Sequence, residues 1–398
     1  MAVNKKGWQT KTLDQALQKT QTINPLQSPE VEFDYIDVSS VSNTTFQIKE
    51  IQRIKGKDAP SRARRVVRAN DVLFATVRPT LQRIAIVPEH LDNQVCSTGY
   101  FILRPKAGID HRFVFYSLFT QKFMRQMEIL QKGASYPAVT DGEVRAQVIP
   151  VPPLPEQKRI VGILDEAFAG IATAKANAKK NLQNARALFE SHLQSVFTQR
   201  GPDWVDRTLD QVCIVERGSS PRPIKEYFTT KPGGVNWIKI GDTEEGGKYV
   251  YSTAQKITLE GAKQSRFVKE GDFILTNSMS FGRPYIMKTS GYIHDGWFVL
   301  RLNIAIDTDY FYYLLSSAIV QSQFASLASG SVVKNISGDL VKQAVLPIPP
   351  LAHQHAIVKK LLGISEESQR LASLYARKLA ALDELKKSLL HQAFTGNL

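Results

Sequence analysis

The chain has 398 residues, of which 43% are hydrophobic and 22% charged, a balance that excludes a disordered chain and predicts more than one folded core. Two cysteines are too few for a disulfide framework, and the longest apolar run, Tyr310–Leu315, is far shorter than the roughly 20 residues that cross a membrane. Its first residues have no apolar core typical of a secretion signal, so we expect a cytoplasmic protein with no membrane partner; the net charge of +14 favours a polyanionic partner.

Residues 1–155 predict the first of two globular parts of the mixed α/β (α+β) class. Short apolar segments at 35–41, 71–77 and 83–87 are separated by Gly, Pro, Ser and Asn, which is typical of short strands in an antiparallel or mixed sheet. Residues Phe113–Glu128 have a helical period without breakers and predict one helix.

A proline-rich stretch, Pro150–Val161 (PVPPLPEQKRIV), follows this globular part. Each proline fixes φ and disfavours helix in the residue before it, whereas Pro155 and Glu156 suit the first turn of a helix. Residues 156–199 contain no proline and are rich in strong helix formers. The stretch therefore predicts a hinge at which a helix of over 40 residues begins.

The same stretch returns 197 residues later as Pro347–Val358 (PIPPLAHQHAIV), with seven of the twelve positions identical. It follows residues 202–351, which predict a second globular part with its own helix over Tyr310–Ala325. Residues 353–395 again contain no proline and predict a second long helix. The start of that helix is expected to be less well capped, because His353 stands where the first copy has a glutamate.

Further residue pairs show that a whole domain is duplicated. Arg104 corresponds to Arg301 at the same offset of 197, and Asp71 corresponds to Asp272 at an offset of 201. The interiors of the two copies, roughly residues 25–95 and 220–290, have otherwise diverged. Two copies of one frame with different interiors indicate two related binding domains with different targets.

Both long helices carry apolar residues at a spacing of three and four over about five heptads, which is typical of a coiled coil. In the second helix the positions are Ile357, Leu361, Ile364, Ser368, Leu371, Tyr375, Lys378, Leu382, Leu385 and Leu389, and the first helix carries the equivalent positions 197 residues earlier. Because the first helix ends at the second globular part, where the second helix begins, we expect an antiparallel pair. Helices that fold onto their own domains or pair between chains remain alternatives.

The sequence contains no motif that predicts catalysis or a metal site. There is no GxxxxGK[ST] or GxGxxG phosphate loop and no NPPY-type methyltransferase motif. His353 and His355 lie two residues apart, on different faces of a helix start, which disfavours joint metal binding. Glu384 and Lys386 form an isolated E-x-K without the strand or acidic companion of a nuclease centre.

Loops rich in basic and amide side chains point to DNA instead. Arg reads guanine edges, Asn and Gln read adenine edges, and Ser and Lys bind phosphates. The candidate DNA-contacting residues are Arg62, Arg64, Arg65, Arg68, Arg78, Gln82, Arg83 and Tyr136 in the first copy and Arg217, Ser219, Ser220, Arg222, Lys225, Asn277, Ser278, Arg283, Lys334 and Asn335 in the second. The first copy is the more basic, because residues 1–155 hold 21 Lys and Arg against 14 Asp and Glu, whereas residues 202–351 hold 16 against 15.

In these features the whole chain resembles the specificity (S, or HsdS) subunits of type I restriction–modification systems. The resemblance rests on the two copies Val148–Val161 and Val345–Val358, on Gly133 and Gly330, and on the ending Phe394–Leu398 (FTGNL). It also includes the loop RGSSPRP that begins at Arg217.

The resemblance implies target recognition domains at 1–155 and 202–351, which read the two halves of a split, asymmetric DNA target. The helices at 156–201 and 352–398 would set the spacing and dock two methyltransferase (M) subunits, with restriction (R) subunits further out. No cofactor is expected on this chain, since S-adenosylmethionine would bind M, and ATP and Mg would bind R. The alternatives are a fused or solo DNA-modifying enzyme and a coiled-coil interaction protein that does not bind DNA.

Overall fold

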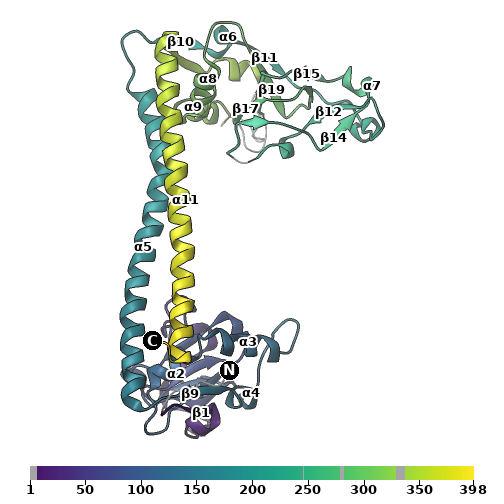
Figure 1. The fold of residues 1–398 in the computed structure, drawn as a ribbon. Coiled ribbons are helices and arrows are strands. Elements are labelled where there is room, and N and C mark those ends of the chain that lie inside the picture. The colour runs from purple at the N-terminus through teal and green to yellow at the C-terminus, as the bar shows by residue number, and fades with distance from the viewer. Residues whose placement is uncertain (1–6, 245, 278–281, 329–336) are drawn as a thin grey trace. The chain divides into compact units, whose positions relative to one another are not determined.

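The computed structural model describes residues 7–244, 246–277, 282–328 and 337–398. The chain divides into two compact units, residues 1–179 with 376–398 and residues 180–375. Each unit combines a mixed α+β part with a segment of each long helix, α5 (Leu154–Thr198) and α11 (Leu351–Thr395) (Figure 1). The predicted fold class is confirmed. The predicted domain limits at 155, 201 and 351 lie close to the ends of these helices.

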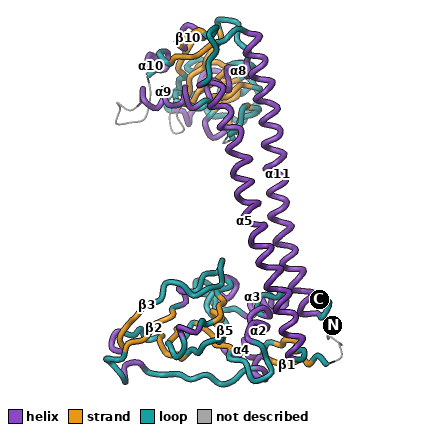
Figure 2. Tube along the Cα trace, turned by 90° about the vertical axis from the view of Figure 1, so that its left-hand side faces the viewer, coloured by secondary structure: helices purple, strands orange, loops and turns teal. Residues whose placement is uncertain are grey.

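The first unit contains the sheets β3-β2-β7-β4 and β6-β5-β8 and the antiparallel pair β1-β9. Its strands are β1 (Gln9–Thr12), β2 (Glu32–Ile36), β3 (Gln52–Lys55), β4 (Ala63–Val66), β5 (Val72–Ala75), β6 (Ile84–Ile86), β7 (Val95–Ser97), β8 (Tyr100–Leu103) and β9 (Val148–Val151). Its helices are α1 (Leu13–Ala16), α2 (His111–Ser117), α3 (Gln121–Leu130) and α4 (Asp141–Arg145), and its 3₁₀ turns are η1 (Pro25–Gln27), η2 (Val38–Ser40), η3 (Gly56–Asp58), η4 (Pro79–Leu81) and η5 (Glu89–Leu91). Strands β2 and β3 lie side by side in Figure 2, and β2 also pairs in parallel with β7, so the sheet is mixed.

The second unit contains the sheets β11-β19-β16-β17-β13 and β14-β12-β18-β15 and the pair β10-β20. Its strands are β10 (Val205–Thr208), β11 (Cys213–Arg217), β12 (Val235–Ile238), β13 (Tyr249–Val250), β14 (Gln255–Ile257), β15 (Arg266–Val268), β16 (Phe273–Thr276), β17 (Pro284–Met287), β18 (Gly291–Ile293), β19 (Trp297–Leu302) and β20 (Val345–Ile348). Its shorter helices are α6 (Leu209–Val212), α7 (Leu259–Ala262), α8 (Thr308–Ser316), α9 (Ala318–Ala328) and α10 (Gly338–Lys342), with the 3₁₀ turns η6 (Ile224–Tyr227) and η7 (Ile240–Asp242).

The repeated Asp and Arg residues of the sequence form the same buried ion pair in both units. Arg104 donates to both carboxylate oxygens of Asp71 at 2.8 and 2.7 Å, and Arg301 donates to Asp272 at 3.2 Å. Both aspartates are almost fully buried at the starts of the equivalent core strands β5 and β16. This ion pair explains why both the aspartate and the arginine occur in each copy, although the aspartates lie 201 residues apart and the arginines 197 residues apart.

Each single helix expected within the globular parts is two helices in the structure. The segment predicted at 113–128 is divided into α2 and α3, because Thr120 leaves the helical conformation and accepts a hydrogen bond from Phe123 N–H as the N-cap of α3. The segment predicted at 310–325 is divided between α8 and α9 at the buried Ser317. The prediction was wrong on continuity because these polar residues bond locally to the backbone, which interrupts a helix.

The two long helices run antiparallel in each unit. In the first unit the side chains of Ile160 and Leu164 pack with those of Ala393 and Phe394, and Lys175 forms an ion pair with Asp383. In the second unit the Ser368 hydroxyl donates to the Ala185 carbonyl oxygen at 2.7 Å. The expected antiparallel pairing is confirmed.

Only one of the two predicted seam columns is buried along its length. The buried or half-buried column contains Leu164, Ile171, Ala178, Ala185 and His192 in α5 and Leu361, Ser368, Tyr375, Leu382 and Leu389 in α11. The other column is buried or half-buried at its first three positions in each helix and exposed at its last two, so that Leu188 and Leu385 are 46% and 47% exposed. The predicted coiled-coil pattern is confirmed, and the partner helix covers one column along its length and the other only in part.

The proline-rich hinge is held by a buried glutamine. Gln157 Nε2 donates to the carbonyl oxygens of Pro152 (2.8 Å) and Gly108 (3.1 Å), and Gln157 Oε1 accepts from Asp110 N–H (2.8 Å). Asp110 is the N-cap of α2, so one side chain ties the start of α5 to α2 and to the proline stretch.

The second copy of the hinge keeps this arrangement. Gln354 donates to the Pro349 carbonyl oxygen and accepts from Asp307 N–H, both at 2.8 Å. Helix α11 also begins at Leu351, the position equivalent to Leu154 of α5. His353 Nδ1 lies 2.9 Å from Asp203 Oδ2, which supplies a local contact where the glutamate is missing.

Candidate nucleic-acid interface

The first unit presents an exposed cation–aromatic pair at its loops. Arg78 and Gln82 both adopt left-handed backbone conformations, with φ of 50° and 55°, on either side of η4. Arg78 N–H donates to the Pro137 carbonyl oxygen at 2.6 Å, and its guanidinium lies 5.1 Å from the ring centre of Tyr136, which is 73% exposed. Backbone strain of this kind concentrates at functional sites, and a fixed arginine beside an exposed ring suits contact with bases and phosphates.

The arginine cluster beside β4 is only partly available to a ligand. Arg62 and Arg68 are exposed. Arg64 instead donates to the Asn24 side-chain oxygen at 2.5 Å, and Arg65 forms an ion pair with Asp141 at 2.8 Å. The exposed members can bind a phosphate backbone without losing a side-chain partner among the residues that the structure describes.

Arg83, another predicted contact, has a structural role in the first unit. Its guanidinium donates to the carbonyl oxygens of Val38, Ser39 and Val41 at 2.8 to 3.3 Å, at the end of η2. Using this arginine to read a base would leave three carbonyl groups to be satisfied by other donors. Arg83 therefore supports the loop at η2 and is not one of the proposed DNA contacts.

In the second unit, residues predicted in separate loops converge on one turn at His294–Gly296. The Ser220 hydroxyl donates to Asp295 Oδ1 at 2.8 Å, and Arg222 donates to Asp295 Oδ2 at 3.2 Å. Arg217 Nε lies 3.3 Å from the Asp295 carbonyl oxygen. The loop after β11 is thus folded around a single aspartate.

Asn277 connects a second loop to the same turn. Asn277 is only 1% exposed. Its backbone N–H donates to the Gly296 carbonyl oxygen at 2.7 Å, and its side-chain Nδ2 donates to the Asp295 carbonyl oxygen at 3.2 Å. Its side-chain oxygen is buried and has no hydrogen-bond partner among the described residues. Asn277 therefore holds the turn from inside and does not reach the surface in this conformation.

The remaining candidate DNA contacts of the second unit differ in how exposed their side chains are and in their hydrogen-bond partners. Lys225 is exposed on η6, and the Ser219 hydroxyl donates to the Gln264 carbonyl oxygen at 2.8 Å. Arg283 is half-buried, and its backbone N–H donates to the Thr276 hydroxyl oxygen at 2.9 Å. Ser278, Lys334 and Asn335 lie outside the described residues.

The sequence analysis did not identify His294 and Asp295 as part of this site. His294 packs against Trp237 and Trp297, and its burial lowers its pKa. Burial would raise the pKa of Asp295, but the hydrogen bond from Ser220 and other local contacts hold it below its usual value. An Asp-Gly pair directly after an apolar strand is a turn signal, and it could have drawn attention to the position.

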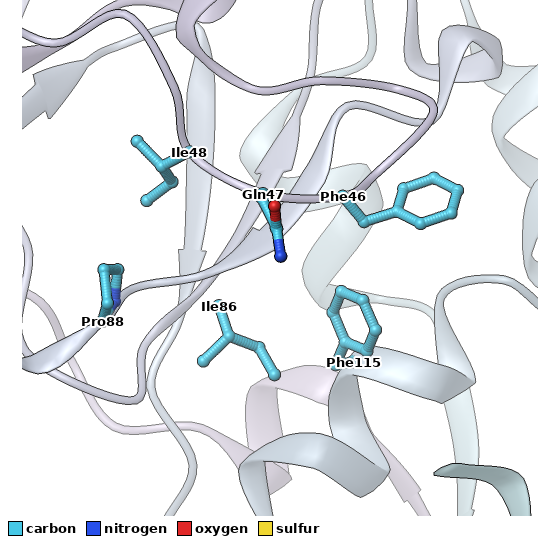
Figure 3. A pocket seen from close by; sticks show the side chains of 6 residues that line it. All are labelled: Phe46, Gln47, Ile48, Ile86, Pro88 and Phe115. Carbon is cyan, nitrogen blue, oxygen red and sulfur yellow. The ribbon is translucent and has the colours of Figure 1, made fainter. Parts of the chain in front are cut away.

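Two pockets in the described part of the first unit lack catalytic groups. One of about 310 Å³ in the first unit is lined by Phe46, Gln47, Ile48, Ile86, Pro88 and Phe115 (Figure 3). Another, of about 580 Å³, is lined by Thr22, Ile23, Asn24, Pro25, Gln27, Ser28, Val31 and Phe33. None of these lining residues is titratable, so neither pocket can position a general acid or base.

Metal ligands are also dispersed in the described residues. No group of three or more His, Cys, Asp or Glu side chains there is arranged to hold a metal ion. His353 pairs with Asp203, and His355 lies 3.4 Å from Asp307, so the two histidines have different partners. No helix among these residues is both long enough and apolar enough to span a membrane.

A duplicated α+β domain with basic loops, each copy attached to a long paired helix, defines a binding protein of two related modules. A sequence profile described as "Type I restriction modification DNA specificity domain" matches residues 5–184 and again residues 202–374. The chain therefore belongs to the family of type I restriction–modification DNA specificity domains and carries two of them.

Individual relatives agree with this assignment over most of the chain. The specificity subunit of the MjaVIII type I restriction enzyme of Methanocaldococcus jannaschii is 24% identical over 317 residues, which cover 73% of this chain and 71% of the relative. The crystal structure of the HsdS subunit from Thermoanaerobacter tengcongensis is 28% identical with a TM-score of 0.75, covering 98% of this chain and 97% of that one. A chain from a structure on complex assembly and conformational transition of the type I R-M system is also 28% identical, with a TM-score of 0.84 and 98% coverage of both chains. The resemblance predicted from the sequence is confirmed, as is its class, a non-catalytic specificity subunit.

Proposed function

We propose that this chain reads a split, asymmetric DNA sequence for a type I restriction–modification complex, with one half-site for each unit. The observation that carries the proposal is the repeat itself, in which one structural frame supports two different sets of exposed basic loops. The proposed contacts are Arg62, Arg68, Arg78 and Tyr136 in the first unit and Arg217, Arg222 and Lys225 in the second. These side chains can bind phosphates and the acceptor-rich edges of guanine.

A domain exchange tests the proposal. The chain is expressed with its methyltransferase subunit, and methylated sites are mapped across a genome with residues 25–95 in place or replaced by the equivalent segment of a relative. Because the frame is kept, we expect the exchange to change one half of the target and to leave the other half and the spacing unchanged. Methylation that changes in both halves, or that does not depend on this chain, contradicts the proposal.

The partner proposal is two copies of one methyltransferase subunit, with restriction subunits added to the assembled complex. Its support is that Leu188 and Leu385, which are equivalent at the offset of 197, are both left exposed by the helix pair. An exposed leucine at the same helical position in each unit offers the same surface twice, which suits two identical partners. In this proposal S-adenosylmethionine binds the methyltransferase subunit, ATP and Mg bind the restriction subunit, and the complex acts on DNA in the cytoplasm.

A single charge substitution tests this stoichiometry. With Leu385→Asp we expect a complex with one methyltransferase subunit in place of two, measured by the mass of the purified assembly. Ala376→Asp is the control, since it places the same charge on the exposed opposite side of α11. If Leu385→Asp leaves two bound subunits, this leucine is not part of the docking surface.

A further inference from the structure

Asp295 lies at the centre of the donors that the second unit offers to DNA. Its carboxylate binds the Ser220 hydroxyl and the Arg222 guanidinium, and its carbonyl oxygen lies within reach of Arg217 and Asn277. Its side chain is 43% exposed, so DNA that approaches these donors also approaches the carboxylate. An acidic group in this position is unexpected in a surface that binds a polyanion.

The turn that carries Asp295 is held firmly by its surroundings. Asn277 N–H donates to the Gly296 carbonyl oxygen at 2.7 Å, and Gly296 N–H donates to His294 Nδ1 at 2.9 Å. A Cβ atom at Gly218 would lie 2.1 Å from the His294 carbonyl oxygen, so the neighbouring loop is packed directly on the turn. The carboxylate is therefore fixed in place and cannot easily withdraw when DNA binds.

Arg222 is in the opposite situation. Its side chain is 81% exposed, and its contact with Asp295 is a surface ion pair, which contributes little to stability. A DNA phosphate can take the guanidinium from Asp295, but the carboxylate then faces the phosphate at close range. Since residues 202–351 hold 16 Lys and Arg against 15 Asp and Glu, few surplus cations in this part of the chain offset that repulsion.

We propose that Asp295 is a specificity-determining residue, whose carboxylate competes with DNA phosphates for Arg222 and weakens the binding of sequences that do not match the second unit. A matching sequence offsets this effect where a base edge offers an amino group, such as cytosine N4, to the carboxylate. The inference rests on the proposed function and adds a repulsive element to it, since specificity also depends on weakening the wrong complexes.

The test compares two duplexes with the purified complex of this chain and its methyltransferase subunit. One duplex carries the target found by methylation mapping, and the other has the half read by the second unit scrambled. For Asp295→Asn, which keeps an oxygen for Ser220, we expect about five-fold tighter binding of the scrambled duplex, the order of one charge contact in water. Binding of the target duplex should change by less than about two-fold, because the substitution removes both the repulsion of the phosphate and the contact of the carboxylate with a base amino group.

Salt dependence and a control variant complete the measurement. The slope of log affinity against log salt for the scrambled duplex should become steeper by up to about 0.9, the value for one more phosphate contact. Asp339→Asn removes the same charge from an exposed i,i+3 pair with Lys342, and it should not change the preference between duplexes. In an Arg222→Ala background the effect of Asp295→Asn should become smaller, since no guanidinium remains to be released and only the repulsion between the carboxylate and the phosphate is removed.

Two results would overturn the inference. Equal tightening of both duplexes would show a general charge effect, and equal weakening of both would show that the carboxylate only holds the loop in its DNA-binding shape. If the complex without substitutions does not distinguish the duplexes, the proposed function itself fails. If it distinguishes them and Asp295→Asn changes nothing, only the role of Asp295 is rejected.

Discussion

Replacing Gln157 by methionine should loosen the hinge of the first unit. The substitution keeps the length of the side chain but removes three hydrogen bonds, to the Pro152 and Gly108 carbonyl oxygens and from Asp110 N–H. Pro152 is buried, so its carbonyl group would lose its partner at a cost of about 1–3 kcal/mol, while each of the other two bonds is worth about 1 kcal/mol. We expect a loss of about 3–5 kcal/mol in the opening free energy of this hinge.

Hydrogen–deuterium exchange resolved by peptide measures this loss for each unit separately. Gln157→Met should reduce protection in α2 and at the start of α5, whereas Gln354→Met should reduce protection in α8 and at the start of α11. Gln354 makes two such bonds, one of them to the buried Pro349 carbonyl, so its loss should be about 2–4 kcal/mol. Lys158→Met is the exposed control and should change neither hinge. Losses below about 1 kcal/mol in both glutamine variants would refute the hinge argument.

Three further substitutions test other parts of the structure. Arg104→Met leaves the buried Asp71 carboxylate unpaired and should destabilise the first unit by about 3–5 kcal/mol, measured by chemical denaturation. Arg78→Ala should weaken DNA binding by about 1–3 kcal/mol and relax selectivity in one half-site only, measured by titration with duplexes changed in either half. Burial lowers the pKa of His294, so its contribution to stability is complete above about pH 6.5 and is lost as the pH falls below that value. His294→Asn, which keeps an acceptor for Gly296 N–H, should therefore reduce the difference in melting temperature of the second unit between pH 7 and pH 5.5.

Local signals in the sequence were sufficient to predict most of the fold. The prolines of the hinge and the long proline-free segments after them predict α5 and α11, because these features act on the backbone over a few residues. The breaks at Thr120 and Ser317 were missed because hydroxyl side chains are compatible with a helix until they bond to the backbone. Such a bond depends on the surrounding packing.

The candidate site was less predictable than the fold. Composition identified the exposed Arg78 and Arg222, since donors in turn-rich loops are a local feature. The convergence of Ser220 and Asn277 on Asp295 depends on contacts between residues far apart in the chain. A search for cations and amides in a DNA-binding surface also passes over an aspartate, although its position controls the donors around it.

Equivalent positions of the two long helices do not always make the same kind of contact with the globular part of their unit. In the first unit the Lys386 ammonium lies 5.0 Å from the ring centre of Phe168, 5.1 Å from that of Phe46 and 6.0 Å from that of Phe119. The equivalent position of the second unit, 197 residues earlier, is Phe189, whose ring packs on Tyr313 at 5.8 Å. The same place in the frame thus holds a cation in one copy and an aromatic ring in the other, and the repeat alone does not indicate which contact forms.

Lys386→Met measures how much the ammonium group adds to the packing of the lysine side chain. Methionine keeps most of the apolar stem of lysine, so the substitution removes only the charge. The stability lost is therefore the cation–aromatic attraction minus the cost of desolvating the ammonium group. This desolvation also lowers the pKa of Lys386. We expect a net loss of about 1 kcal/mol in the opening free energy of the first unit, measured by exchange in α3 and at the end of α11. Lys387→Met, at the exposed neighbouring position, should have no such effect. Greater protection in Lys386→Met would show that desolvation outweighs the attraction, so that the aromatic rings hold the lysine through its stem alone.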